Sequence, residues 1–170
     1  MEKKVQLDAV ENLPTKALFG YCSILSVSEV GRYYDFLWYK FIERLTLANI
    51  SQDRELYGVC ANLSRSGFFE YWTAIEIRSG EEVPEDLIDI PMVAGTYGSK
   101  VERPDTPLPL IYGKLSEQWE RPSDYVLNWR QPFYELYKPN WSNRRAVKFC
   151  LPLFVGFELA DKSLSSELTT

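Results

Sequence analysis

The chain has no histidine among its 170 residues. This absence excludes Ser-His and Cys-His nucleophile pairs, His-ligated metal ions and imidazole acid-base chemistry together. Its three cysteines, Cys22, Cys60 and Cys150, are an odd number and lack the close spacing of a zinc site. They favour buried free thiols in a reducing compartment, and we expect no metal and no other cofactor.

Long apolar runs are also missing. The longest, from Phe149 to Phe157, contains Pro152 and Gly156, whereas a membrane-spanning helix needs about 20 apolar residues. No apolar stretch follows the charged residues after Met1, so we expect no secretory signal, no membrane and a cytoplasmic protein. The net charge of −5 argues against direct nucleic-acid binding and tolerates a cationic partner.

What the chain has in abundance is aromatic residues, which make up 15% of it, with eleven tyrosines and five tryptophans. Hydrophobic periodicity predicts that they lie on a pattern of strands and helices that occurs twice. The first copy is a strand over 16–26, a helix over 29–48 that starts at the Ser26–Glu29 capping box, and strands over 57–63 and 68–77.

The second copy has the same order. It comprises a strand over 92–102, a helix that Thr106–Pro107 opens and Pro122 ends, and strands over 133–137 and 147–153. Corresponding elements are offset by about 78 positions, which indicates two similar halves. We therefore predict an α+β fold of two βαββ halves related by a pseudo-twofold axis. It would have an antiparallel sheet, two helices and a central cleft; the alternative is an ordinary α+β domain without a pocket. Residues 1–14 would form an N-terminal segment, 15–157 the domain and 158–170 a polar tail.

Short motifs occur in a characteristic order along this pattern. They are Leu37-Trp38-Tyr39-Lys40-Phe41, Tyr57-Gly58-Val59, Phe69-Glu70-Tyr71-Trp72-Thr73-Ala74-Ile75-Glu76-Ile77, Ile90-Pro91-Met92-Val93-Ala94-Gly95-Thr96-Tyr97, Ile111-Tyr112-Gly113, Trp119 with Asp124-Tyr125, Phe133-Tyr134-Glu135-Leu136-Tyr137 and Leu151-Pro152-Leu153. In order and spacing they resemble the GyrI-like, or AraC-type, effector-binding domain, which is also the multidrug-binding half of BmrR-like regulators. The resemblance covers roughly residues 15 to 155.

Regulators of this family carry a DNA-binding segment ahead of the domain, whereas here residues 1–14 are neither helical in pattern nor strongly basic. The resemblance therefore implies a stand-alone ligand-binding module, similar to single-domain members such as one from an integron gene cassette that binds cationic drugs. A separate DNA-binding partner and a homodimer both stay open.

Glu135 is the first candidate for a ligand contact. Strand alternation puts it on one face with Phe133 and Tyr137. A buried carboxylate there is costly unless it is paired, hydrogen-bonded or protonated. The family's cation-contacting glutamate falls on this motif, so the resemblance implies that Glu135 pairs with a hydrophobic organic cation. The alternative is a glutamate hydrogen-bonded to tyrosine hydroxyls with no ligand role.

Glu76 is the second candidate, either assisting Glu135 or lying at a solvated strand end beside Arg78.

Aromatic faces would form the wall of the pocket, because they attract cations and stack on flat ligands. The candidates, taken from the elements that face the cleft in the family, are Tyr33, Tyr57, Tyr71, Trp72, Tyr97, Tyr112 and Phe149. Trp38, Phe41 and Leu45 form a helical stripe that we assign to the core.

The leading hypothesis is a binding module for drug-like hydrophobic cations, acting as a sensor or as a transcription-regulator module, and not an enzyme. Two alternatives remain open from the sequence. Some family members hydrolyse cyclopropane-containing toxins, and Glu135 would then be a general base on water. Others inhibit gyrase as protein–protein inhibitors.

Overall fold

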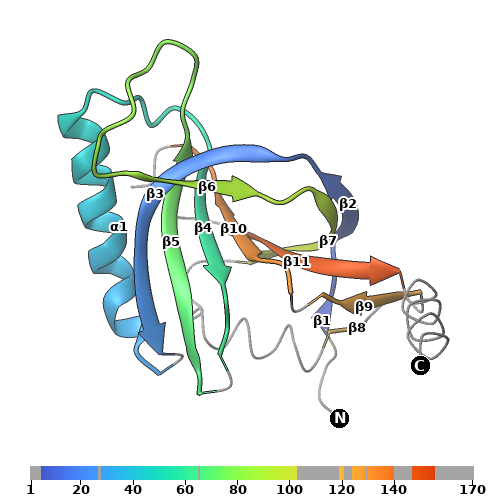
Figure 1. Ribbon diagram of the computed structural model, residues 1–170. Helices are drawn as coiled ribbons and strands as arrows, with labels where there is room; N and C mark the ends of the chain where they lie inside the picture. Colours follow the sequence, from blue (N-terminus) through green and yellow to red (C-terminus); the bar gives the residue numbers. More distant parts are fainter. Residues whose placement is uncertain are drawn as a thin grey trace, which may run out of the picture.

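The computed structural model describes residues 5–26, 28–64, 66–102, 119–120, 124–128, 130–139 and 147–155. Within these ranges one helix, α1 (Val30–Leu47), lies against a large sheet (Figure 1). The strands are β1 (Val5–Gln6), β2 (Ala9–Leu13), β3 (Lys16–Ser26), β4 (Leu56–Ala61), β5 (Phe68–Glu76), β6 (Ile88–Met92), β7 (Gly95–Glu102), β8 (Trp119–Glu120), β9 (Tyr125–Leu127), β10 (Phe133–Tyr137) and β11 (Val147–Val155).

The sheet confirms the predicted α+β class and shows its internal symmetry. The strand order is β2-β7-β11-β10-β4-β5-β3-β6, with β9 also pairing with β11. Neighbouring strands in this sheet are antiparallel. The first half contributes β3-β5-β4 and the second half contributes β10-β11-β7 in mirrored order, so β4 and β10 meet at the centre. This arrangement is what a pseudo-twofold axis between two similar halves requires.

Helix α1 begins and ends at recognisable signals. The Glu29 carboxylate accepts hydrogen bonds from the hydroxyl (2.6 Å) and the amide (3.4 Å) of Ser26, so the predicted Ser26–Glu29 contact is present. The predicted capping box is incomplete, however, because Glu29 itself is the N-cap of α1 and no side chain caps the helix there. Asn49 ends the helix with a φ of 55°, a left-handed conformation that asparagine tolerates better than most residues. The amide of Ile50 then donates to the carbonyl of Leu45. The helix is thus fixed at both ends.

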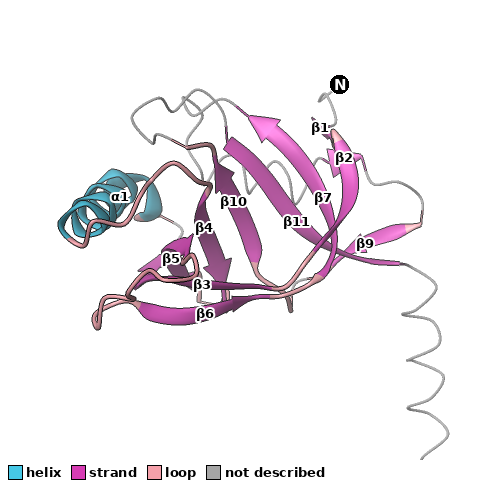
Figure 2. Ribbon diagram, turned by 90° about the horizontal axis from the view of Figure 1, so that it is seen from above, coloured by secondary structure: helices cyan, strands magenta, loops and turns pink. Residues whose placement is uncertain are grey.

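The core is divided by the sheet into two layers. On the α1 side, Trp38, Phe41 and Leu45 are fully buried against Ile75 and Phe149, which confirms the helical core stripe. The opposite side is filled by Leu18, Tyr57, Val59, Ala74, Met92, Tyr97, Tyr134 and Cys150. Figure 2 shows α1 on one side of the curved sheet.

Three sequence predictions differ from the structure. Residues 9–13, assigned to a segment before the domain, form β2 and pair with β7. Polar side chains obscure the strand period there, and Asp8 fixes the register by accepting hydrogen bonds from the Lys100 ammonium (2.9 Å) and the Val101 amide (2.7 Å). The loop before the second half contains strand β6, which pairs with the first part of β3. Trp119, predicted to lie in the second helix, lies in β8, which pairs with β1 in parallel.

The remainder of the predicted second helix, from Thr106 to Gln118, lies outside the described residues, as do Tyr112 and the tail 158–170. In the ranges that the structure describes, no helix is both long and apolar enough to cross a membrane.

The packing of α1 predicts a large stability difference between two phenylalanines of the same helix. Phe41 is fully buried and Phe36 is 53% exposed. We expect Phe41→Ala to lower the free energy of unfolding by about 3–5 kcal/mol, because the cavity left in the core refills poorly. The matched control, Phe36→Ala, should stay within about 0.5 kcal/mol of the parent chain. Urea denaturation measures both, and equal effects would contradict this account of the core.

Candidate functional site

The carboxylate of Glu135 lies at the centre of the sheet. Its strand, β10, runs between β4 and β11, with Glu135 opposite Gly58 on one side and Phe149 on the other. Glu135 is completely inaccessible to solvent. The predicted burial of this side chain is therefore confirmed, and its charge has to be compensated inside the protein.

Two tyrosine hydroxyls donate to the same oxygen of Glu135. Tyr71 donates to Oε2 over 2.8 Å and Tyr137 over 2.6 Å. The indole Nε1 of Trp38 in turn donates to the Tyr71 hydroxyl over 2.8 Å. Burial disfavours the charged form of a carboxylate, while donors directed at it stabilise that form. The chain Trp38–Tyr71–Glu135 thus orients a buried acceptor.

Gly58 makes room for this carboxylate. A Cβ at position 58 would lie 2.4 Å from Oε2 of Glu135 and 2.9 Å from the Tyr71 hydroxyl. Both distances are shorter than van der Waals contact allows, so only glycine permits the observed position of the carboxylate over β4. The small residue of one half accommodates the large residue of the other at the point where the halves meet.

Aromatic rings from α1 and the sheet surround the site. The ring of Tyr34 lies 5.8 Å from that of Tyr71, and the ring of Trp38 lies 4.9 Å from that of Tyr137. The hydroxyls of Tyr34 and Tyr137 are also hydrogen-bonded to each other. We call Glu135, Tyr71, Tyr137, Trp38 and Tyr34 the Glu135 cluster. It combines one carboxylate with four aromatic side chains, which is the composition that recognises cations and flat rings.

The structure brings only some of the predicted site residues to this cluster. Strand register puts Glu135, Tyr71 and Phe149 on the α1 side of the sheet, whereas Tyr57, Trp72, Glu76 and Tyr97 lie on the opposite side. Tyr33 is on α1 and 38% exposed. Of the six other described candidates, the sheet separates four from the Glu135 carboxylate, and Glu76 is one of these four.

Three members of the Glu135 cluster were not among the predicted ligand contacts. Trp38 fits the core stripe of the helix, and hydrophobic periodicity does not reveal that its indole N–H donates a hydrogen bond to the cluster. Tyr137 shares the strand face of Glu135, which alternation alone could have revealed. Tyr34 occupies the next turn of the same helical stripe. Their meeting at one carboxylate depends on pairing between distant strands.

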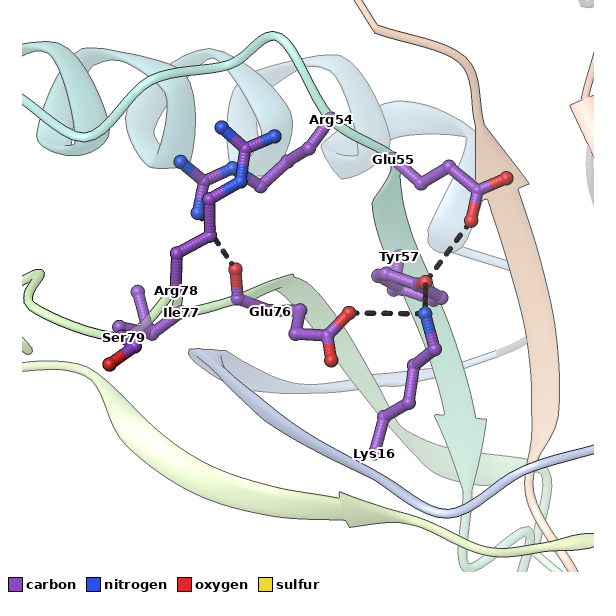
Figure 3. Close-up of a pocket in the computed structure, with 8 residues that line it drawn as sticks. All are labelled: Lys16, Arg54, Glu55, Tyr57, Glu76, Ile77, Arg78 and Ser79. Carbon is purple, nitrogen blue, oxygen red and sulfur yellow. Dashed lines mark hydrogen bonds and ion pairs between the residues drawn. The ribbon is translucent and has the colours of Figure 1, made fainter.

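A separate pocket lies on the side of the sheet that carries Tyr57 and Glu76 (Figure 3). We call it the Lys16–Tyr57 pocket; it is lined by Lys16, Arg54, Glu55, Tyr57, Glu76, Ile77, Arg78 and Ser79. The Lys16 ammonium donates to the Tyr57 hydroxyl (3.1 Å) and to Glu76 (3.0 Å). Burial opposes the charge of Lys16, but these hydrogen bonds outweigh it and hold its pKa above the ordinary value. Glu76 therefore serves an ion pair at the rim of this pocket.

The wall of the pocket also contains a strong ion pair. Nη1 of Arg54 donates to Glu81 over 2.6 Å and to the backbone carbonyl of Glu76 over 3.0 Å. The hydrogen bond from Arg54 lowers the pKa of Glu81 from 4.5 to about 2, against a smaller opposing effect of burial.

The space above Gly58 predicts a stability difference between two glycines. Gly58→Ala should cost about 1–3 kcal/mol, because the new methyl group displaces the Glu135 carboxylate from its donors. Gly31, in the first turn of α1, has no atom within 4 Å of an added Cβ. Gly31→Ala should instead stabilise the protein by about 0.5–1 kcal/mol. Chemical denaturation measures both, and a harmless Gly58→Ala would contradict the tight fit at Glu135.

The pair Arg54–Glu81 predicts a pH dependence. The folded pKa of Glu81 is below its ordinary value, so its contribution to stability is complete above pH 4.5 and disappears as the pH falls toward about 2. The difference in unfolding free energy between the parent chain and Glu81→Gln should shrink over this interval. Denaturant titrations at several pH values measure it, and a difference that does not change with pH would refute the assignment.

Comparisons with known proteins agree on the fold. No family model matches the chain, and no curated protein matches its sequence. Solved structures do match it. The structure of SAV2435 bound to tetraphenylphosphonium has a TM-score of 0.62 at 13% identity, covering 86% of this chain and 93% of that one. The integron cassette protein VCH_CASS2 of Vibrio cholerae has a TM-score of 0.61 at 12% identity, covering 86% and 95%. The EcmrR C-terminal domain has a TM-score of 0.52 at 9% identity, covering 86% and 96%.

These identities are low, so what they establish is a common architecture over most of each chain. The chain therefore shares its fold with a protein bound to tetraphenylphosphonium, an integron cassette protein and the EcmrR C-terminal domain, which agrees with the fold that the sequence motifs predict.

Proposed function

We propose that this protein is a small-molecule binding module that holds hydrophobic organic cations beside Glu135, with the aromatic side chains of the Glu135 cluster as the hydrophobic surface. The observation that carries the proposal is the buried carboxylate, which accepts hydrogen bonds from two tyrosines and is completely shielded from solvent.

The electrostatics of the cluster support a cationic ligand. The hydroxyls of Tyr71 and Tyr137 supply hydrogen bonds to Glu135 but no net charge. An organic cation would add a positive charge beside the carboxylate, in surroundings where water screens the attraction weakly. Charge attraction would then favour cations over neutral molecules of the same shape.

The aromatic rings support a hydrophobic ligand. A cation over a tyrosine or tryptophan face gains about 0.5–2 kcal/mol, and aromatic pairs add roughly 0.5–1.5 kcal/mol. Ring faces and one carboxylate select for bulk and positive charge, without a fixed hydrogen-bond pattern. We therefore expect broad selectivity among such cations and affinities near micromolar, about −8 kcal/mol.

The fold comparison supports the same ligand class. SAV2435, which shares this fold over most of its length, is bound to tetraphenylphosphonium, a bulky cation without hydrogen-bond donors. The similarity to the EcmrR C-terminal domain supports a sensor or transcription-regulator role for the present chain, since EcmrR has also been observed in complex with DNA. A cytoplasmic location suits Cys22 and Cys150, which are free thiols.

The proposal gives Glu135 a binding role and no catalytic one. Two hydroxyls donate to its Oε2, an arrangement that stabilises the carboxylate as an acceptor and competes with removal of a proton from water. If the protein were instead a hydrolase, an incubated cyclopropane-containing substrate would give product that accumulates with time and with enzyme concentration.

Tetraphenylphosphonium titration tests the proposal. We expect saturable quenching of tryptophan fluorescence, and Glu135→Gln should weaken binding at least tenfold, about 1.4 kcal/mol, because it removes the charge and keeps the shape. Glu70→Gln is the matched control: Glu70 lies on β5 with its side chain on the side of Trp72, away from the cluster. Its affinity should equal that of the parent chain.

Two results would overturn the assignment. Equal losses in Glu135→Gln and Glu70→Gln would indicate a general effect of protein charge. No saturable binding of tetraphenylphosphonium or of a rhodamine-type dye to the folded parent chain would remove the cation-binding function itself.

A further inference from the structure

The Lys16–Tyr57 pocket has no role in the proposed cation binding. It encloses about 510 Å³, a volume in the range of small-molecule sites. Tyr57 and Glu76 project into it from the side of the sheet opposite Glu135. Figure 3 shows Lys16 reaching from β3 toward Tyr57 and Glu76. Any ligand held here would therefore bind apart from the Glu135 cluster.

One buried donor in its wall lacks an acceptor. The Arg54 side chain is only 8% exposed. Its Nη1 and Nη2 are bound to Glu81 and to the carbonyl of Glu76. Its Nε is buried and has no hydrogen-bond partner among the described residues. A buried N–H without an acceptor is unfavourable, so a ligand oxygen that reaches Nε would be favoured by the new hydrogen bond.

Two further cations line the same pocket. Lys16 has three N–H donors, of which Tyr57 and Glu76 accept two. Arg78 is half exposed and pairs with Asp53 over 3.1 Å, a surface ion pair that exchanges its partner at little cost. The lining thus contains three cationic groups and two carboxylates, Glu55 and Glu76. Arg54 and Arg78 are also paired with Glu81 and Asp53, so an anion would bind here to hydrogen-bond donors on cationic side chains and not to a net positive charge.

We propose that the Lys16–Tyr57 pocket binds a small organic anion, whose carboxylate or phosphate oxygen accepts a hydrogen bond from Nε of Arg54. Arg78 and Lys16 share the negative charge of the ligand. Glu55 and Glu76 limit the charge that the pocket accepts, so a singly charged anion binds better than a multiply charged one. This site would bind an anion, whereas the Glu135 cluster would bind a cation, and it lies on the other side of the sheet.

The test follows the Arg54 Nε–H directly by ¹⁵N-edited NMR of the full chain. Sodium benzoate and inorganic phosphate are titrated separately at constant ionic strength, with sodium chloride as the reference salt. The Arg54 signal, assigned by its loss in Arg54→Lys, should shift saturably with at least one probe and stay unmoved in chloride. A response to benzoate alone or to phosphate alone identifies which anion chemistry the pocket prefers.

Substitutions at half-exposed positions give a second test, which does not depend on whether the Arg54→Lys variant folds. Arg78→Gln should weaken anion binding by about threefold, as expected for one partly solvated charge. Glu76→Gln should strengthen it, because a repelling carboxylate is removed. Arg44→Gln is the matched control, since Arg44 pairs with Asp86 and lines a different pocket.

Three outcomes would overturn the proposal: no saturable shift with either probe, the same shift in chloride, or equal weakening by Arg78→Gln and Arg44→Gln. Each can be told apart from failure of cation binding, because the tetraphenylphosphonium titration uses a probe of opposite charge and the Glu135→Gln variant.

Discussion

The burial of one carboxylate at the centre of the sheet constrains the architecture around it. Glu135 sits where β4 and β10, one strand from each half, run side by side. Its charge is costly to bury, and the protein compensates with the hydroxyls of Tyr71 and Tyr137. The helix contributes through Trp38, which orients Tyr71. The packing of α1, the pairing of the two halves and the orientation of the Glu135 carboxylate therefore depend on one another. Gly58 leaves the space that this carboxylate occupies.

The sheet gives the molecule two chemically different sides. On the α1 side, a carboxylate is surrounded by aromatic rings, a combination suited to hydrophobic cations. On the other side, the Lys16–Tyr57 pocket has more cationic than anionic groups in its lining. Because side chains alternate along a strand, adjacent positions of β4 such as Tyr57 and Gly58 face opposite sides of the sheet. The same short strand thus borders both sites without bringing their opposite charges together.

Periodicity and turn chemistry were enough to predict much of this fold. The strands Lys16–Ser26 and Phe133–Tyr137 have the predicted bounds, and α1 starts after the predicted Ser26–Glu29 contact. Alternation also placed Glu135 on a buried face. It could not show that Tyr57, Trp72, Glu76 and Tyr97 belong to the other side, because that depends on which strands pair and in which register. Gly58 and the Nε of Arg54 left no periodic signal, since their roles arise from contacts between distant residues.

The central claim is that the Glu135 carboxylate marks the binding position of a hydrophobic cation. The most direct measurement is a crystal structure of the protein with tetraphenylphosphonium. The account predicts that the phosphonium lies on the α1 side of the sheet, with its phenyl rings against the aromatic side chains of the Glu135 cluster. A phosphonium found in the Lys16–Tyr57 pocket, or bound only at the protein surface, would contradict it.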